Sequence, residues 1–189
     1  MRVREMTEAD AAGVAAARVG GWRYAYAGIM PQAYLDALSV TADTERRRTM
    51  LRNGLPGARH LVSEDGGGAV TGWASYGPYR GKEHGPETHG DRGGPAAAGR
   101  GDPQDADGEV YALYVHPEAI GTGTGRALLT AVLEQAGALG CPGLRLWVVE
   151  GNARARRFYE RAGFAPDGAR QLFEVGGAPV PEVRYRRAL

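Results

Sequence analysis

The sequence predicts an α/β fold in which a mixed central sheet of about six to seven strands is flanked by helices. Two segments, 109–138 and 144–164, carry most of this prediction. Each begins with a short apolar run typical of a buried strand and continues through a glycine-containing turn into residues at helical spacing. A strand–loop–helix–strand–helix order makes the two strands parallel neighbours that are joined by a right-handed crossover.

The first segment has the features of a phosphate-binding site. An apolar strand is expected over 110–115, and a helix follows in which apolar residues recur from Ala127. Gly121, Gly123 and Gly125 lie between them. Glycine allows sharp turns and close approach to a ligand, and a helix N-terminus offers unpaired N–H groups and a positive dipole end. The pattern favours a phosphate or pyrophosphate ligand, and a ligand-free connection is the alternative.

Spacing argues against two common nucleotide-binding motifs. A dinucleotide fingerprint, Gly-x-Gly-x-x-Gly, would need its last glycine at Arg126 or Leu128. A P-loop needs Gly-Lys-Ser/Thr, and the only lysine of the chain is Lys82. A nicotinamide enzyme and a P-loop nucleotidase are therefore disfavoured.

The second segment supplies the next strand and helix. An apolar strand is expected over 144–149, and Asn152 stands at the expected helix start. Phe158 and Tyr159 share a helix face, and Gly163 is placed to end the helix.

Together the two segments resemble the acyl-CoA-binding motifs of the GCN5-related N-acetyltransferase (GNAT) superfamily. The resemblance covers a single domain over about 1–189 and is most specific over 109–164. The matching residues are the loop 120–125, with Ile120 where the family usually has glutamine or arginine, then Asn152, Phe158-Tyr159 and Gly163-Phe164.

The resemblance implies transfer of the acetyl group of acetyl-CoA, a co-substrate, to a primary amine by direct attack. The N–H of Val115 would polarise the acetyl carbonyl. Tyr159, whose ordinary pKa is about 10, would be the general acid, and Glu109 would be the base through a water molecule. The coenzyme-binding residues that the resemblance implies are Leu113, Tyr114, Val115, Gly121, Thr122, Gly123, Thr124, Gly125, Arg126, Asn152 and Tyr159.

Each of these roles has a structural alternative. Tyr159 is otherwise a core aromatic residue, Asn152 a helix N-cap, and Glu109 an exposed glutamate at a strand end. The chain as a whole is otherwise an acyl-CoA-binding regulatory module without turnover, although a retained Tyr159 argues against that function.

The acceptor pocket is expected between the first two helices and the last two strands. Core packing and exposed sheet positions are the alternatives for its residues. The candidates for its wall are Trp22, Tyr24, Tyr26, Trp73 and Tyr76, and those for binding the acceptor's ammonium are Glu174 and Glu182. Small-molecule amines and peptide amines both remain open as acceptors, among them polyamines, amino acids and antibiotics.

Composition excludes several classes of protein. The chain of 189 residues has a formal net charge of +1, so neither nucleic acid nor an anionic membrane is an expected partner. Cys141 is the only cysteine, and the four histidines show no metal-ligand spacing, so no metal is expected. No apolar run is long enough to span a membrane and no signal-peptide core is present, which favours the cytoplasm. The oligomeric state is open, with a homodimer among the alternatives.

The remaining elements complete the predicted scaffold. One segment, 77–108, contains nine glycines and four prolines and is predicted to be a flexible loop, either a lid over the acceptor site or a tolerated insertion. The other expected elements are a strand at 3–6, a helix opened by a Thr7–Asp10 capping box, helices from Pro31 and over 42–52, and strands at 60–64, 69–76, 171–175 and 182–187.

Overall fold

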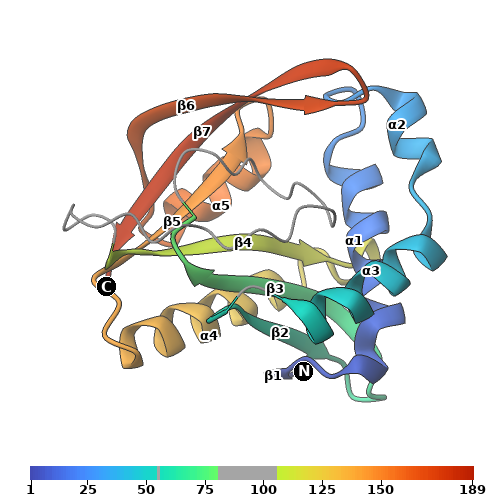
Figure 1. Cartoon of the computed structure of the whole chain (residues 1–189), viewed down its shortest axis with the longest axis horizontal. Helices are drawn as coiled ribbons and strands as arrows, with labels where there is room; N and C mark the ends of the chain where they lie inside the picture. Colours follow the sequence, from blue (N-terminus) through green and yellow to red (C-terminus); the bar gives the residue numbers. More distant parts are fainter. Residues whose placement is uncertain (55, 81–105) are drawn as a thin grey trace.

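The computed structural model describes residues 1–54, 56–80 and 106–189 and contains a mixed seven-stranded sheet flanked by helices (Figure 1). The strand order is β1-β2-β3-β4-β5-β7-β6. The strands are β1 (Arg2–Glu5), β2 (Arg59–Glu64), β3 (Val70–Pro78), β4 (Gly108–Val115), β5 (Gly143–Val149), β6 (Ala165–Val175) and β7 (Ala178–Ala188). The helices are α1 (Ala11–Ala25), α2 (Gln32–Ala37), α3 (Val40–Asn53), α4 (Thr124–Ala138) and α5 (Ala153–Arg161). The predicted fold class is confirmed.

Local signals in the sequence account for several element ends. The Asp10 carboxylate accepts hydrogen bonds from the Thr7 backbone N–H, at 2.7 Å, and from the Thr7 hydroxyl, at 2.9 Å, just before α1. Pro31 directly precedes α2. Gly163 follows the end of α5 with φ at 84°, a conformation that glycine adopts without strain.

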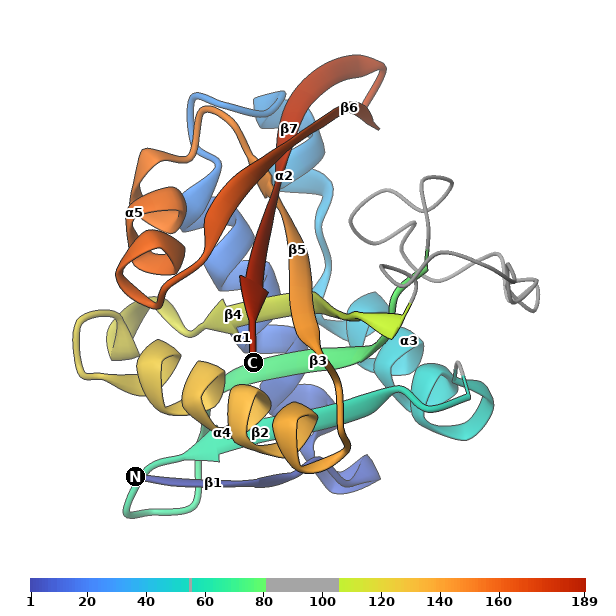
Figure 2. The ribbon, with the colours of Figure 1, turned by 90° about the vertical axis from the view of Figure 1, so that its left-hand side faces the viewer.

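The sheet has two differently covered faces. On the α4 face, Leu128, Leu129 and Val132 of α4 pack in one apolar cluster with Val110 and Leu146 of the sheet. On the α1 face, α1 and α3 cover β2 and β3, and further along the sheet α1 and α2 pack against β5 and β7. Figure 2 shows α4 and α5 on one side of the strands and α3 on the other. Side chains alternate between the two faces along the strands, except at register shifts such as the one in β4, where Val110 and Ala112 lie on opposite faces.

The parallel strands β4 and β5 pair only at their beginnings. Gly108 is paired with Leu144 and Glu109 with Arg145, and no later pair is formed. Beyond these pairs, 110–115 of β4 and 146–149 of β5 are not paired with one another, and the two strands diverge (Figure 1). We call this region the β4–β5 opening. The opening lies between the strand of the first predicted segment, 109–138, and the strand of the second, 144–164.

The prediction of a loop over 77–108 is wrong at both ends. Gly77 and Pro78 belong to β3, and Gly108 belongs to β4, because these residues pair with one another across the two strands. Arg80 also makes specific contacts, which are given below. The rest of this predicted loop, 81–105, lies outside the described residues, as does the predicted lid.

Within the part of the chain that the structure describes, no helix has the length and apolar character needed to cross a bilayer.

Candidate active site

The start of α4 has a backbone suited to an anion. Gly121 and Gly123 have φ values of 88° and 93°, which side-chain-bearing residues rarely adopt. No side chain caps α4, and its first turn contains no acidic residue. Among the described residues, the N–H groups of Thr124, Gly125 and Arg126 have no hydrogen-bond acceptor. These donors, at the positive end of a helix of 15 residues, form the kind of site that binds phosphate.

The open edge of β4 provides backbone donors next to this helix start. The His116 N–H donates to the Thr71 carbonyl at 2.8 Å, on the β3 side. Because donors alternate along an antiparallel ladder, Tyr114 also directs its N–H to β3, and Leu113 and Val115 direct theirs into the β4–β5 opening. The backbone N–H groups of two of the three predicted strand residues therefore point into the opening. Tyr114 instead has its side chain on the α1 face, near Trp22 and Trp73.

Tyr159 of α5 is buried against other aromatic residues. Its ring makes edge contacts with Phe158, at a centroid distance of 5.1 Å, and with Phe164, at 5.9 Å. Its hydroxyl has no hydrogen-bond partner among the described residues, and the hydroxyl oxygen is not completely buried. Burial raises the pKa of Tyr159, so the phenol stays protonated at neutral pH. This is the state that a general acid needs.

Asn152 lies at the start of α5, where its side chain caps the helix. Its Oδ1 accepts the Ala155 N–H at 3.0 Å, so it is the N-cap of α5. The cap uses only the oxygen and leaves the amide nitrogen available as a donor.

Glu109 lies at the narrow end of the β4–β5 opening and is buried, not exposed. Arg80 binds its carboxylate through the backbone N–H at 3.1 Å, Nε at 3.3 Å and Nη2 at 2.8 Å. The guanidinium also lies 4.1 Å from the ring centre of Tyr111. Sequence reasoning missed Arg80, because 29 residues separate it from Glu109 and no local pattern connects them.

The aromatic residues predicted for the acceptor wall are divided between the two faces. Trp22 and Trp73 are buried on the α1 face, where Tyr114 lies against both, and Tyr26 contacts Trp22 at a centroid distance of 5.1 Å. Tyr76 packs on the α4 face, and its hydroxyl donates to Gln135 of α4 at 2.7 Å. The structure therefore does not bring Tyr76 together with the others. Tyr24, at the end of α1, is exposed and accepts a hydrogen bond from Arg154 of α5.

The two glutamates predicted to bind the acceptor's ammonium lie on opposite faces of the β6–β7 hairpin. Glu182 is paired across β5 with Val149 and across β6 with Gln171, and it is buried on the α1 face. Glu174 is exposed and belongs to the other face, because it stands an odd number of residues from Gln171 in β6. The two-residue turn at 176–177 sets the register between β6 and β7. The sequence therefore already indicated that Glu174 and Glu182 lie on opposite faces.

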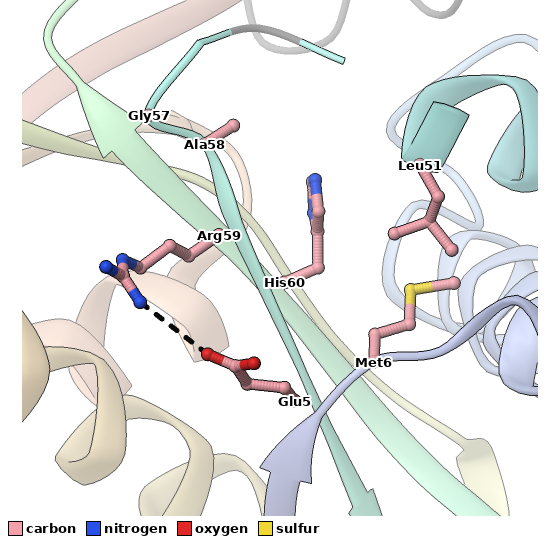
Figure 3. A pocket seen from close by; sticks show the side chains of 7 residues that line it. All are labelled: Glu5, Met6, Leu51, Gly57, Ala58, Arg59 and His60. Atoms are coloured by element: carbon pink, nitrogen blue, oxygen red, sulfur yellow. Dashed lines mark ion pairs between the residues drawn. The ribbon is translucent and has the colours of Figure 1, made fainter. Parts of the chain in front are cut away.

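A cavity of about 310 Å³ is found elsewhere, at the β1 edge of the sheet (Figure 3). Met6 and Leu51 point toward one another there beside His60, and Glu5 forms an ion pair with Arg59 at 3.6 Å. None of its lining residues comes from β4, α4, β5 or α5. It is separate from the β4–β5 opening.

The geometry agrees with the sequence comparisons. A family model described as the acetyltransferase (GNAT) family matches residues 30–164. The chain belongs to this acetyltransferase family. It is 30% identical over 182 residues to the uncharacterized N-acetyltransferase YuaI of Bacillus subtilis, covering 96% of this chain and 89% of that protein. The chain is therefore an acyltransferase.

One further relative matches only part of this chain, and two solved structures share its fold at low sequence identity. A mycothiol acetyltransferase of Beutenbergia cavernae is 47% identical over 64 residues, which are 34% of this chain and only 22% of that protein. The crystal structure of a ribosomal-protein-alanine N-acetyltransferase from Brucella melitensis has a TM-score of 0.69 at 23% identity, with both chains fully covered. A putative acetyltransferase from Salmonella typhimurium, solved with its cofactor acetyl-CoA, has a TM-score of 0.66 at 21% identity and covers 100% of this chain and 93% of its own.

Proposed function

We propose that this acetyltransferase transfers the acetyl group of acetyl-CoA to a primary amine by direct attack. The observation that carries the proposal is the uncapped start of α4 beside the open edge of β4. The first offers N–H donors to a pyrophosphate at 121–126, and the second offers N–H donors to the coenzyme arm at Leu113 and Val115. The Salmonella protein of the same fold carries acetyl-CoA as its cofactor.

The backbone of β4 also sets a limit on where the acetyl group lies. We propose that one of its free N–H groups polarises the acetyl carbonyl. Val115 is six residues from Glu109, about 20 Å along an extended strand, and Leu113 is four residues away, about 13 Å. A carbonyl held by the Leu113 N–H is therefore better placed than one held by Val115 for a proton path to Glu109.

We assign the proton transfers to Glu109 and Tyr159. The amine nitrogen forms a bond to the acetyl carbon as the carbon–sulfur bond breaks. One proton of the ammonium passes through water to Glu109, and the leaving thiolate takes a proton from Tyr159. The amide nitrogen gives up a second proton, which returns to Tyr159 through solvent. Arg80 fixes the orientation of the Glu109 carboxylate at the narrow end of the opening.

Replacing Tyr159 by phenylalanine tests this function. The variant keeps the ring and its contacts with Phe158 and Phe164 but removes the proton, so acetyl-CoA affinity should change little while kcat falls. Thiol release from acetyl-CoA over a panel of amines measures turnover, and calorimetry measures affinity. Loss of coenzyme affinity or of thermal stability with kcat unchanged would show that the tyrosine is structural. Coenzyme binding by the wild type without thiol release for any amine would instead favour a regulatory acyl-CoA-binding module.

A further inference from the structure

The buried carboxylate of Glu182 differs from the other buried carboxylates in its hydrogen-bond partner. Within the described ranges, four buried carboxylates each form an ion pair with arginine: Asp10, Asp43, Asp107 and Glu109. Glu182 is 2% exposed, yet its hydrogen bond comes from the neutral Gln171 amide at 2.9 Å. Burying a carboxylate without a cation is costly, and burial raises the pKa of Glu182 to about 7. A cation is therefore the complement that this position lacks.

Among the described residues, no cation is paired with Glu182, and the charged groups near it have partners of their own. Arg184, two residues along β7 on the same face, is paired with Asp167 at 2.7 Å. From β5 the facing residue is Val149, and from β6 it is Gln171. From α1 and α2, Trp22 and Leu35 belong to the adjoining apolar cluster. Arg18 of α1, which lies 4.8 Å from the Trp22 ring, is paired with Asp43 at 3.1 Å. The described structure thus supplies Glu182 with hydrocarbon neighbours and one neutral donor.

One oxygen of this carboxylate remains available to a ligand. Oε2 accepts the hydrogen bond from Gln171. Oε1 has no hydrogen bond among the described residues, and this oxygen is not completely buried. Oε1 therefore has the capacity to accept a hydrogen bond from a ligand.

Glu182 lies beside the part of β5 that borders the β4–β5 opening. It is paired with Val149, the last residue of β5. Counted from the Glu109–Arg145 pair, Val149 and Leu113 each stand four residues along their strands, so both belong to the parts of β5 and β4 that border the opening. Glu182 is one strand beyond Val149, on the face where α1 and α2 lie.

We propose that Glu182 binds the amino group of the acceptor as an ammonium ion, and that the acceptor is a primary amine with an apolar body. This inference rests on the proposed acetyl transfer and names its substrate class. The apolar body follows from the neighbours of the carboxylate, which include Val149, Val180 and Phe173. An α-amino acid is disfavoured, because its own carboxylate would approach a negative site whose nearest described arginine is already paired.

The test is calorimetric titration of phenethylamine into the coenzyme A complex of the full chain. Glu182→Gln keeps the shape and a hydrogen bond to Gln171 but removes the charge, and it should raise the Kd for phenethylamine at least tenfold. Glu174→Gln is the matched control, since it makes the same change on the exposed face of the same hairpin and should leave the Kd unchanged. Coenzyme A affinity should be equal in all three proteins.

A pH series separates ion pairing from packing. Phenethylamine stays protonated between pH 6 and 8, so its Kd for the wild type should fall over this range as Glu182 ionises. The Kd for Glu182→Gln should stay constant, and 2-phenylethanol should not distinguish the two proteins.

Three outcomes would overturn the assignment: equal phenethylamine Kd values for wild type and Glu182→Gln, tighter binding of phenylalanine than of phenethylamine, or no wild-type binding of either phenethylamine or hexylamine. Because the titration needs no turnover, a wild type that binds phenethylamine through Glu182 but releases no thiol would refute the proposed function and keep the binding site.

Discussion

Replacing Glu182 by glutamine should make the stability of the protein less sensitive to pH. Burial raises the pKa of this carboxyl from its ordinary 4.5 to about 7. A raised folded-state pKa means that the native state binds the proton more tightly than the unfolded chain. The contribution of this tighter proton binding to the free energy of unfolding is complete below pH 4.5 and is lost as the pH rises through 7. One pKa unit corresponds to about 1.4 kcal/mol, so the wild type should lose about 3 kcal/mol from this group between pH 4 and 8.

Denaturant unfolding of the ligand-free protein at pH 5, 6, 7 and 8 measures this loss. Glutamine resembles the protonated carboxyl, so the free energy of unfolding of Glu182→Gln should exceed that of the wild type increasingly as the pH rises. Glu174→Gln should follow the wild type. The low pKa of Asp10, about 2, which its hydrogen bond from Arg4 maintains, acts below this range and does not interfere. Parallel curves for wild type and Glu182→Gln would show that the carboxyl is already solvated, and the reasoning would fail.

Three further variants test the coenzyme and base assignments. Gly123→Val places a branched side chain at a φ of 93° and next to the free amides of α4, so the acetyl-CoA Kd should rise at least tenfold in calorimetry; unchanged affinity in a folded variant would remove the pyrophosphate from this loop. Glu109→Gln should lower turnover by about 100- to 10,000-fold at neutral pH, with partial recovery as the pH rises. Arg80→Gln keeps the carboxylate but removes the guanidinium contacts that orient it, so turnover should fall less than in Glu109→Gln. Equal losses in both variants would make Glu109 structural.

The proposed coenzyme half of the site could be inferred from sequence because it is built from backbone. Glycines at 121 and 123 indicate φ values that other residues avoid, and the apolar run before them indicates a buried strand. Both signals are local, so they survive without knowledge of the fold. Asn152 and Gly163 mark the ends of α5 in the same way. The structure added the direction of the β4 amides, which depends on pairing with β3.

The acceptor half was less predictable because it is built from side chains that meet only after folding. The Arg80–Glu109 ion pair spans 29 residues, and no period or motif connects its members. Tyr76 stands three residues after Trp73 in β3, so alternation along the strand places the two aromatic residues on opposite faces. Alternation does not indicate which helices cover each face, because that is decided only when α1, α3 and α4 pack on the sheet.

This difference in construction has a consequence for substrate choice. Coenzyme contacts made by backbone N–H groups of β4 and α4 tolerate most side-chain substitutions, whereas the acceptor contacts that we propose depend on one carboxylate and its partner. Gln171 donates to Glu182 from an edge strand, and β6 contacts the rest of the sheet only through β7. Substitutions at 171 and 182 can therefore change the charge offered to the acceptor without disturbing the strands that hold the coenzyme. The preferred amine should be altered most readily from this hairpin.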